Sequence, residues 1–138
     1  MAAQENAAAV QAIYGAFGSG DIPAILERLS EDVAWEEWAD NTAQQGGVPQ
    51  LARRDGRDGA AEFFGVVGEM EVHDFQVLDL IAGGRQVAVE VEIEATPPGG
   101  TRFRDQELHL WTFGDDGLVT RMRHYVDTAK HAACMTGG

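Results

Sequence analysis

Residues 104–127 read RDQELHLWTFGDDGLVTRMRHYVD, and this stretch decides the fold. In each half, polar and apolar residues alternate, which is typical of β-strands with one buried face. The two halves flank a Gly/Asp-rich connection, Gly114 to Gly117, whose composition and length indicate a hairpin turn. We therefore predict an antiparallel hairpin near the end of the printed sequence.

One face of this hairpin carries several polar groups. A register set by the four-residue turn puts Glu107 opposite His124, and a shift by two residues puts His109 there instead. Both registers leave the three side chains on one face, because side-chain directions repeat every two residues. A contact between Glu107 and His124 would fix the imidazole tautomer and raise its pKa, as in acid–base histidines. The alternative is a structural polar pair across the sheet.

Size and composition limit the possible classes of protein. A chain of 138 residues can bury one core, so we expect a single domain, 1–138. A net charge of -13 argues against nucleic-acid partners and anionic membranes, because phosphates would repel it. The first ten residues lack the pattern of a signal peptide, and no apolar run could span a bilayer, so we expect a cytoplasmic protein. Its one cysteine, Cys134, excludes an intramolecular disulfide.

Three amphipathic helices are predicted in the N-terminal half. Apolar residues at helical spacing indicate a first helix over 4–17, a second after the capping residue Asp21, and a third after Asp58. A short strand, 33–38, separates the second from the third, and its two faces each carry one tryptophan and one glutamate. Helices segregated from consecutive strands indicate an α+β fold. We predict a curved antiparallel sheet wrapped round the three helices to form a cone with an internal pocket.

The remaining segments are predicted from their composition. Residues 39–56 are rich in polar residues and glycine, so they form either a pocket lid or a disordered surface excursion. Alternating residues predict strands over 72–82 and 87–96, the second with an acidic outer face. Residues 128–138 predict a loosely held tail. We expect His73 and His131 to face solvent.

Several short segments, in a fixed order along nearly the whole chain, carry a family resemblance: YGAF (14–17) followed by GD (20–21), LSEDVAW (29–35), GR (56–57) followed by FF (63–64), FGDDGLV (113–119) and HYVD (124–127). The sequence resembles the nuclear transport factor 2-like superfamily, and within it the SnoaL-like and ketosteroid-isomerase-like groups. The resemblance implies an α+β cone, a pocket for a small apolar or aromatic ligand, and a homodimer formed through the outer sheet face.

Three residues carry over from the isomerase pattern. Tyr14 takes the place of the tyrosine that donates to the developing oxyanion, and Glu37 takes the place of the aspartate that acts as general base. His109 stands where the pattern has a protonated aspartate. A register change would give the role of Glu37 to Glu36 or Asp40. The resemblance thus implies enolate-type chemistry, with steroid isomerisation itself disfavoured by the change at His109.

Our hypothesis is a small-molecule enzyme performing cofactor-free proton transfer next to a carbonyl, as in isomerases, polyketide cyclases and dehydratases. Glu37 would take the proton, Tyr14 and His109 would stabilise the enolate oxygen, and His124 oriented by Glu107 would be an alternative acid–base. We expect no metal and no cofactor. The pocket walls are predicted from the aromatic and apolar residues of the inner faces: Phe17, Trp35, Trp38, Phe63, Phe64, Trp111, Met122 and Val126.

Two alternatives remain open. One is a non-catalytic ligand-binding or dimerisation module of the same fold. The other is an epoxide hydrolase-like site, which needs an arginine between two inward carboxylates; Arg102, Arg104 and Asp105 are its candidates.

Overall fold

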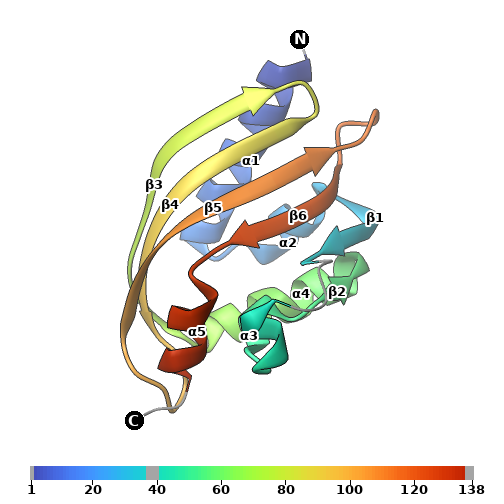
Figure 1. Cartoon of the computed structure of the whole chain (residues 1–138). Coiled ribbons are helices and arrows are strands. Elements are labelled where there is room, and N and C mark those ends of the chain that lie inside the picture. Colours follow the sequence, from blue (N-terminus) through green and yellow to red (C-terminus); the bar gives the residue numbers. More distant parts are fainter. Residues whose placement is uncertain (1, 37–40, 136–138) are drawn as a thin grey trace.

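A computed structural model describes residues 2–36 and 41–135 of the chain (Figure 1). Its elements, in chain order, are α1 (Ala2–Ser19), α2 (Ile22–Leu26), β1 (Leu29–Trp35), α3 (Thr42–Gln45), the 3-10 helix η1 (Pro49–Leu51), β2 (Arg54–Asp55), α4 (Gly56–Gly68), β3 (Glu71–Gly83), β4 (Gln86–Thr96), β5 (Phe103–Phe113), β6 (Val119–Tyr125) and α5 (Thr128–Cys134). This is the predicted α+β fold. Among the described residues, no helix is long and apolar enough to cross a membrane.

The sheet has six strands in the order β2-β1-β6-β5-β4-β3. Strands β3 to β6 form an antiparallel meander, and β1 lies parallel to β6, so the sheet is mixed where the sequence predicted antiparallel pairing. The long strands curve around the helices, with α1, α2 and α4 on the concave side (Figure 1). Helix α1 packs against β3 and β4, and α4 packs against β1.

The core lies between the concave face and these helices. In β4 the residues Val87, Val89 and Val91 are fully buried, while the alternate glutamates point outward. The stripes predicted from helical spacing, such as Val10 and Ile13 in α1, complete the core. Each such side chain stabilises the fold by about 1.5–3 kcal/mol relative to exposure.

Two segments are more ordered than the sequence predicts. Residues 41–56 hold α3, η1 and β2, and their apolar residues Val48 and Leu51 are buried, so this part is no disordered excursion. Asn41 caps α3 through a capping box. Residues 128–134 form α5, whose N-terminus Asp127 caps, and not a loose tail. The cause in both cases is packing between the two segments, a tertiary effect that local composition does not reveal.

The hairpin register is the shifted one of the two alternatives. His109 pairs with His124, because an irregularity between Thr112 and Phe113 displaces the pairing near the turn. Glu107 therefore does not lie opposite His124.

Candidate functional site

A cavity of about 80 Å³ lies between the concave face of the sheet and helices α1 and α4. A water molecule needs about 10–15 Å³ on this measure, so the cavity has room for several. A second, open groove of about 750 Å³ adjoins it and shares six of its lining residues: Tyr14, Phe17, Phe64, Val67, Met70 and Phe75. The groove is thus a natural entrance, walled by apolar side chains.

Tyr14, from α1, reaches across the cavity to β5. Its hydroxyl lies 2.6 Å from Nδ1 of His109 and accepts a hydrogen bond from Nε1 of Trp111 at 3.2 Å. Nε2 of a neutral His109 donates to Glu107, so its Nδ1 has no proton and accepts the hydrogen bond from the hydroxyl of Tyr14. Burial raises the pKa of Tyr14 well above its ordinary value, so the phenol stays neutral.

Glu107 joins two histidines beneath this tyrosine. One carboxylate oxygen accepts from Nε2 of His109 at 3.0 Å and the other from Nε2 of His131 at 3.0 Å. Burial acts to raise the pKa of Glu107, but these hydrogen bonds outweigh it and hold the pKa well below its usual range. Burial and the neighbouring ring of His124 hold the pKa of His109 below its ordinary value. The hydrogen bonds and the directions of the pKa shifts together indicate an ionised Glu107, a neutral His109 and a neutral Tyr14, linked in that order by hydrogen bonds.

The line continues into the C-terminal helix α5. Nε2 of His131 also lies 2.9 Å from Asp105, and its Nδ1 lies 3.2 Å from the amide nitrogen of Gln50. Burial acts to lower the pKa of His131, but Glu107 and Asp105 outweigh it and hold the pKa above its ordinary value. Burial and the charge of Glu107 raise the pKa of Asp105.

His124, from β6, belongs to a separate pair with Glu36. Its Nδ1 lies 2.6 Å from Oε1 of Glu36, and the same oxygen accepts from the backbone N–H of His124 at 2.5 Å. Glu36 is completely buried and has a φ of 55°, an uncommon left-handed conformation for a residue other than glycine. Such strained positions gather at functional sites. Because Oε1 of Glu36 accepts from Nδ1 of His124, the neutral ring of His124 carries its proton on Nδ1.

The two imidazoles meet in the cavity wall. The ring centroids of His109 and His124 lie 4.4 Å apart in an edge-on arrangement. Both nitrogens of His109 are hydrogen-bonded, whereas within the described part of the chain Nε2 of His124 has no hydrogen-bond partner. Nε1 of Trp35, which also lines the cavity, is buried and unpartnered among the described residues. Among the described residues, a ligand in the cavity would therefore find one ring nitrogen without a partner, whereas Nε1 of Trp35 has almost no accessible surface.

The structure brings most of the predicted site residues together. The cavity is lined by Tyr14, Phe17, Trp35, Phe63, Phe64, Glu107, His109, Trp111, Met122 and His124. Val126 is absent from this wall: β6 ends at Tyr125, and Val126 packs on the small cluster of Ala43, Val48 and Leu51. Glu37, Trp38 and Asp40 lie outside the described residues.

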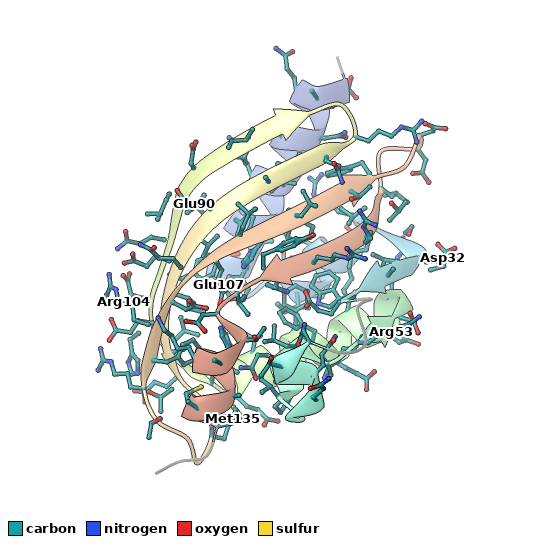
Figure 2. The ribbon with its side chains drawn as sticks, in the orientation of Figure 1. Asp32, Arg53, Glu90, Arg104, Glu107 and Met135 are labelled. Carbon is teal, nitrogen blue, oxygen red and sulfur yellow. The ribbon has the colours of Figure 1, made fainter. Side chains whose placement is uncertain are left out.

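Two predicted roles change. Glu107 orients His109 and not His124, because the register places the two histidines opposite each other and Glu36 supplies the carboxylate for His124. Arg102 and Arg104 pair with Glu92 and Glu94 on the outer face, where Figure 2 shows Arg104 pointing away from the cavity. The arginine-centred arrangement of an epoxide hydrolase-like site is therefore not formed by these residues.

Sequence reasoning missed His131 and gave Glu36 only as a reserve. His131 is 3 % exposed, although it was expected in solvent. The available signal was Asp127, an N-cap residue followed by helix-compatible residues. No local signal marks the turn of Glu36 into the core.

One described group has the donor types of a cation site. Single donor atoms of Asp105, Glu107 and His131 lie within 4.8 Å of one another. In the structure a ring nitrogen of His131 bridges the two carboxylates by hydrogen bonds, so we describe the group as an ion-pair cluster.

The family follows from a sequence comparison. The family model of the SnoaL-like domain matches residues 10–122. The chain belongs to the SnoaL-like domain family. No functionally curated protein is a significant match to this SnoaL-like chain.

Solved structures agree with the assignment. TerC, co-crystallised with polyporic acid, is 29 % identical with a TM-score of 0.73, over 95 % of this chain and 98 % of its own. An NTF2-like protein from Burkholderia xenovorans is 24 % identical with a TM-score of 0.76, over 96 % of both chains. A Mycobacterium tuberculosis protein in complex with estradiol-17β-hemisuccinate is 15 % identical with a TM-score of 0.71, over 91 % of this chain and 96 % of its own. The last two establish the fold alone.

Proposed function

We propose that this SnoaL-like chain is an enzyme that moves protons on a small carbonyl compound without a cofactor. The observation that carries the proposal is the convergence, in one apolar cavity, of two imidazoles that are oriented by different carboxylates. Buried polar groups are costly unless paired or used. Here, within the described residues, His124 lines the cavity and has one ring nitrogen without a hydrogen-bond partner.

His124 is the proposed general base. Glu36 holds the proton on Nδ1, so the lone pair on Nε2 is available to take a proton from a carbon next to a carbonyl. This is the acid–base arrangement in which a buried carboxylate fixes the tautomer of a histidine. The role first given to Glu37 passes to His124, because the described geometry supports it there.

Tyr14 is the proposed partner of the carbonyl oxygen. Its one O–H points at Nδ1 of His109, so turning it toward a ligand requires that Nδ1 carry a proton of its own. The proton makes His109 an imidazolium, and Glu107 balances its charge. As the α-proton leaves for His124, the developing negative oxygen would then face a hydroxyl backed by a positive ring.

The test is exchange of α-protons with solvent. Cyclic enones and aryl ketones would be incubated in D₂O, and loss of the α-proton signal followed by NMR with the unmodified protein, His124→Gln and Glu36→Gln. Removing a general base lowers the rate by about 10²–10⁴-fold. The control is His73→Gln, since His73 is an exposed histidine bonded to Thr96. Exchange that is absent with every ketone, or unchanged in His124→Gln, contradicts the proposal.

A second function keeps the pocket without the chemistry. The observation in its favour is that the hydroxyl of Tyr14 already has two partners, so a ligand can bind without it. TerC, crystallised with polyporic acid, supports a pocket for a small organic ligand. Saturable quenching of tryptophan fluorescence by the same ketones, with no proton exchange, would establish binding alone.

We also propose a homodimer through the outer sheet face. Ile81 is 63 % exposed on that face, and Leu108 and Tyr125 are paired on neighbouring strands of it. Exposed apolar side chains gathered on a sheet mark an interaction surface. Light scattering should give twice the chain mass, and the double change Ile81→Glu with Leu108→Glu should reduce it to one chain; a monomeric unmodified protein contradicts this.

A further inference from the structure

The buried cluster of Asp105, Glu107 and His131 meets the proposed site through Glu107, but His131 itself has no role in the reaction proposed above. His131 comes from the C-terminal helix α5, seven residues after His124. Its ring contacts two carboxylates from β5 and the amide of Gln50 from η1. A histidine predicted to lie in solvent is thus held from three sides inside the fold.

The contacts of the ring indicate its charge. Nε2 lies 2.9 Å from Asp105 and 3.0 Å from Glu107, a position that stabilises a positive ring between two acids. The other nitrogen, Nδ1, lies beside the side-chain amide of Gln50. The amide oxygen of Gln50 is buried and has no partner among the described residues. Turning that amide by 180° lets Nδ1 of an imidazolium donate to the oxygen, and the amide NH₂ then takes the place that has no partner among the described residues.

The remaining surroundings of His131 do not oppose a charge. Lys130, the neighbouring cation on the same helix, is directed to the carbonyl of Arg104 and lies 3.9 Å from Asp105. Cys134 donates to the backbone carbonyl of His131, and the ring packs on Phe103 at 4.8 Å. Asp105 and Glu107 are the titratable groups in contact with the ring.

We propose that His131 is a positioning residue of the site: its imidazolium holds Glu107 as a carboxylate, and Glu107 in turn fixes His109 in the tautomer that accepts from Tyr14. The contacts run without a gap from α5 to the cavity, through distances of 3.0, 3.0 and 2.6 Å. The positive charge of His131 partly offsets the negative charge of Glu107, so less negative charge acts on His109. In the reaction proposed above this neutral tautomer is the resting form, from which His109 gains a proton before Tyr14 turns to the ligand. That role in turnover rests on the proposed function, whereas the charge and tautomer do not.

Removing His131 should therefore raise the pKa of His109. In His131→Gln, Glu107 loses one of its two histidine partners and its full charge acts on the ring of His109. An opposite charge at this range raises the pKa of a histidine by about one unit or more. The protonated ring would then donate to the oxygen of Tyr14, which frees the phenol proton to point into the cavity.

The experiment is NMR of the four histidine side chains in the ¹⁵N-labelled full chain, titrated between pH 5 and 9. Spectra of His131→Gln and of His109→Gln assign the two rings. We expect both nitrogens of His131 to remain protonated at pH 7.5, and His109 to be neutral with the proton on Nε2. In His131→Gln, we expect the titration of His109 to move up by about one pH unit. The matched control is Lys130→Gln, which removes an equal charge from the same helix and should leave His109 unchanged.

Three results would overturn the inference. The first is a His131 that loses a proton at or below the ordinary histidine value of 6.5. The second is a titration of His109 that does not move in His131→Gln, or that moves equally in Lys130→Gln. The third is a His131 that takes a metal-bound signal when Zn²⁺ alone is added, because a ligand ring is neutral. The first and third are read from the unmodified protein, with the ring of His131 assigned by through-bond correlation to its backbone if the variant fails to fold. None uses turnover, so failure of the exchange assay and failure of this inference are distinguishable.

Discussion

Replacing Glu107 by glutamine should destabilise the protein by about 3–5 kcal/mol, the cost of breaking a buried ion pair. The carboxylate accepts from His109 and from His131, each at 3.0 Å. Glutamine keeps one oxygen and puts an NH₂ group where the second oxygen was, so one histidine N–H meets a donor. A hydrogen bond to a charged group contributes about 1.5–3 kcal/mol, and the unpaired imidazolium adds its own desolvation penalty. A domain is stable by only about 5–15 kcal/mol, so the loss is large.

The assay is urea unfolding followed by tryptophan fluorescence, since Trp35 and Trp111 are buried. The control is Glu90→Gln, which makes the same chemical change on the outer face, where Figure 2 shows Glu90 pointing away from the core. An exposed substitution stays within about 0.5 kcal/mol.

The pH dependence of this difference is fixed in sign. The pKa of Glu107 is lowered on folding, so its stabilisation is fully present above the unfolded value of 4.5 and is lost as the pH falls further. The difference between wild type and Glu107→Gln should therefore shrink by about 1.4 kcal/mol per unit as the pH falls below 4.5. A destabilisation equal to that of Glu90→Gln, or one that grows as the pH falls below 4.5, would refute the reasoning.

Tyr14→Phe should lower the free energy of unfolding by about 1–3 kcal/mol in the same assay, because it leaves Nδ1 of His109 and Nε1 of Trp111 buried without their shared partner. His131→Gln should destabilise most below pH 6.5 and less as the pH rises through the raised folded-state pKa of His131, since such a group stabilises in its protonated form; unfolding at pH 6 and pH 9 checks this. The rate of ketone exchange should fall as the pH rises through the lowered pKa of His109, so the alkaline limb of the rate–pH profile should lie below 6.5.

Alternation and helical spacing were sufficient to predict the antiparallel strands β3 to β6 and the helices that cover them. The inner row of β5, with Glu107, His109 and Trp111, follows from period two alone, and the buried faces of α1 and α4 follow from apolar stripes. The orientation of strand β1 could not be predicted in this way, because both faces of residues 33–38 carry the same residue types. Only the structure reveals that the strand ends at Trp35 and that a φ of 55° turns Glu36 inward.

His131 was out of reach for a different reason. A helix of seven residues has little stability by itself, so its existence depends on docking. The docking partners are residues 41–51, a segment whose composition predicts a loop. Each of the two segments has only a weak tendency to form its structure alone, and they stabilise each other by packing together. This packing places His131 beside Glu107.

The assignment of acid and base follows from the number of partners at each imidazole. Two titratable groups divide their roles when their surroundings differ. His109 uses both nitrogens, one toward Tyr14 and one toward Glu107, so it acts through the tyrosine. His124 uses one nitrogen toward Glu36, and its other nitrogen has no partner in the part of the chain that the structure describes, so it can take a proton. The resemblance placed a protonated aspartate at position 109. An imidazole there, hydrogen-bonded to the carboxylate of Glu107, can act on the ligand through the hydroxyl of Tyr14. Its protonated form also carries a positive charge, whereas a protonated aspartate is neutral.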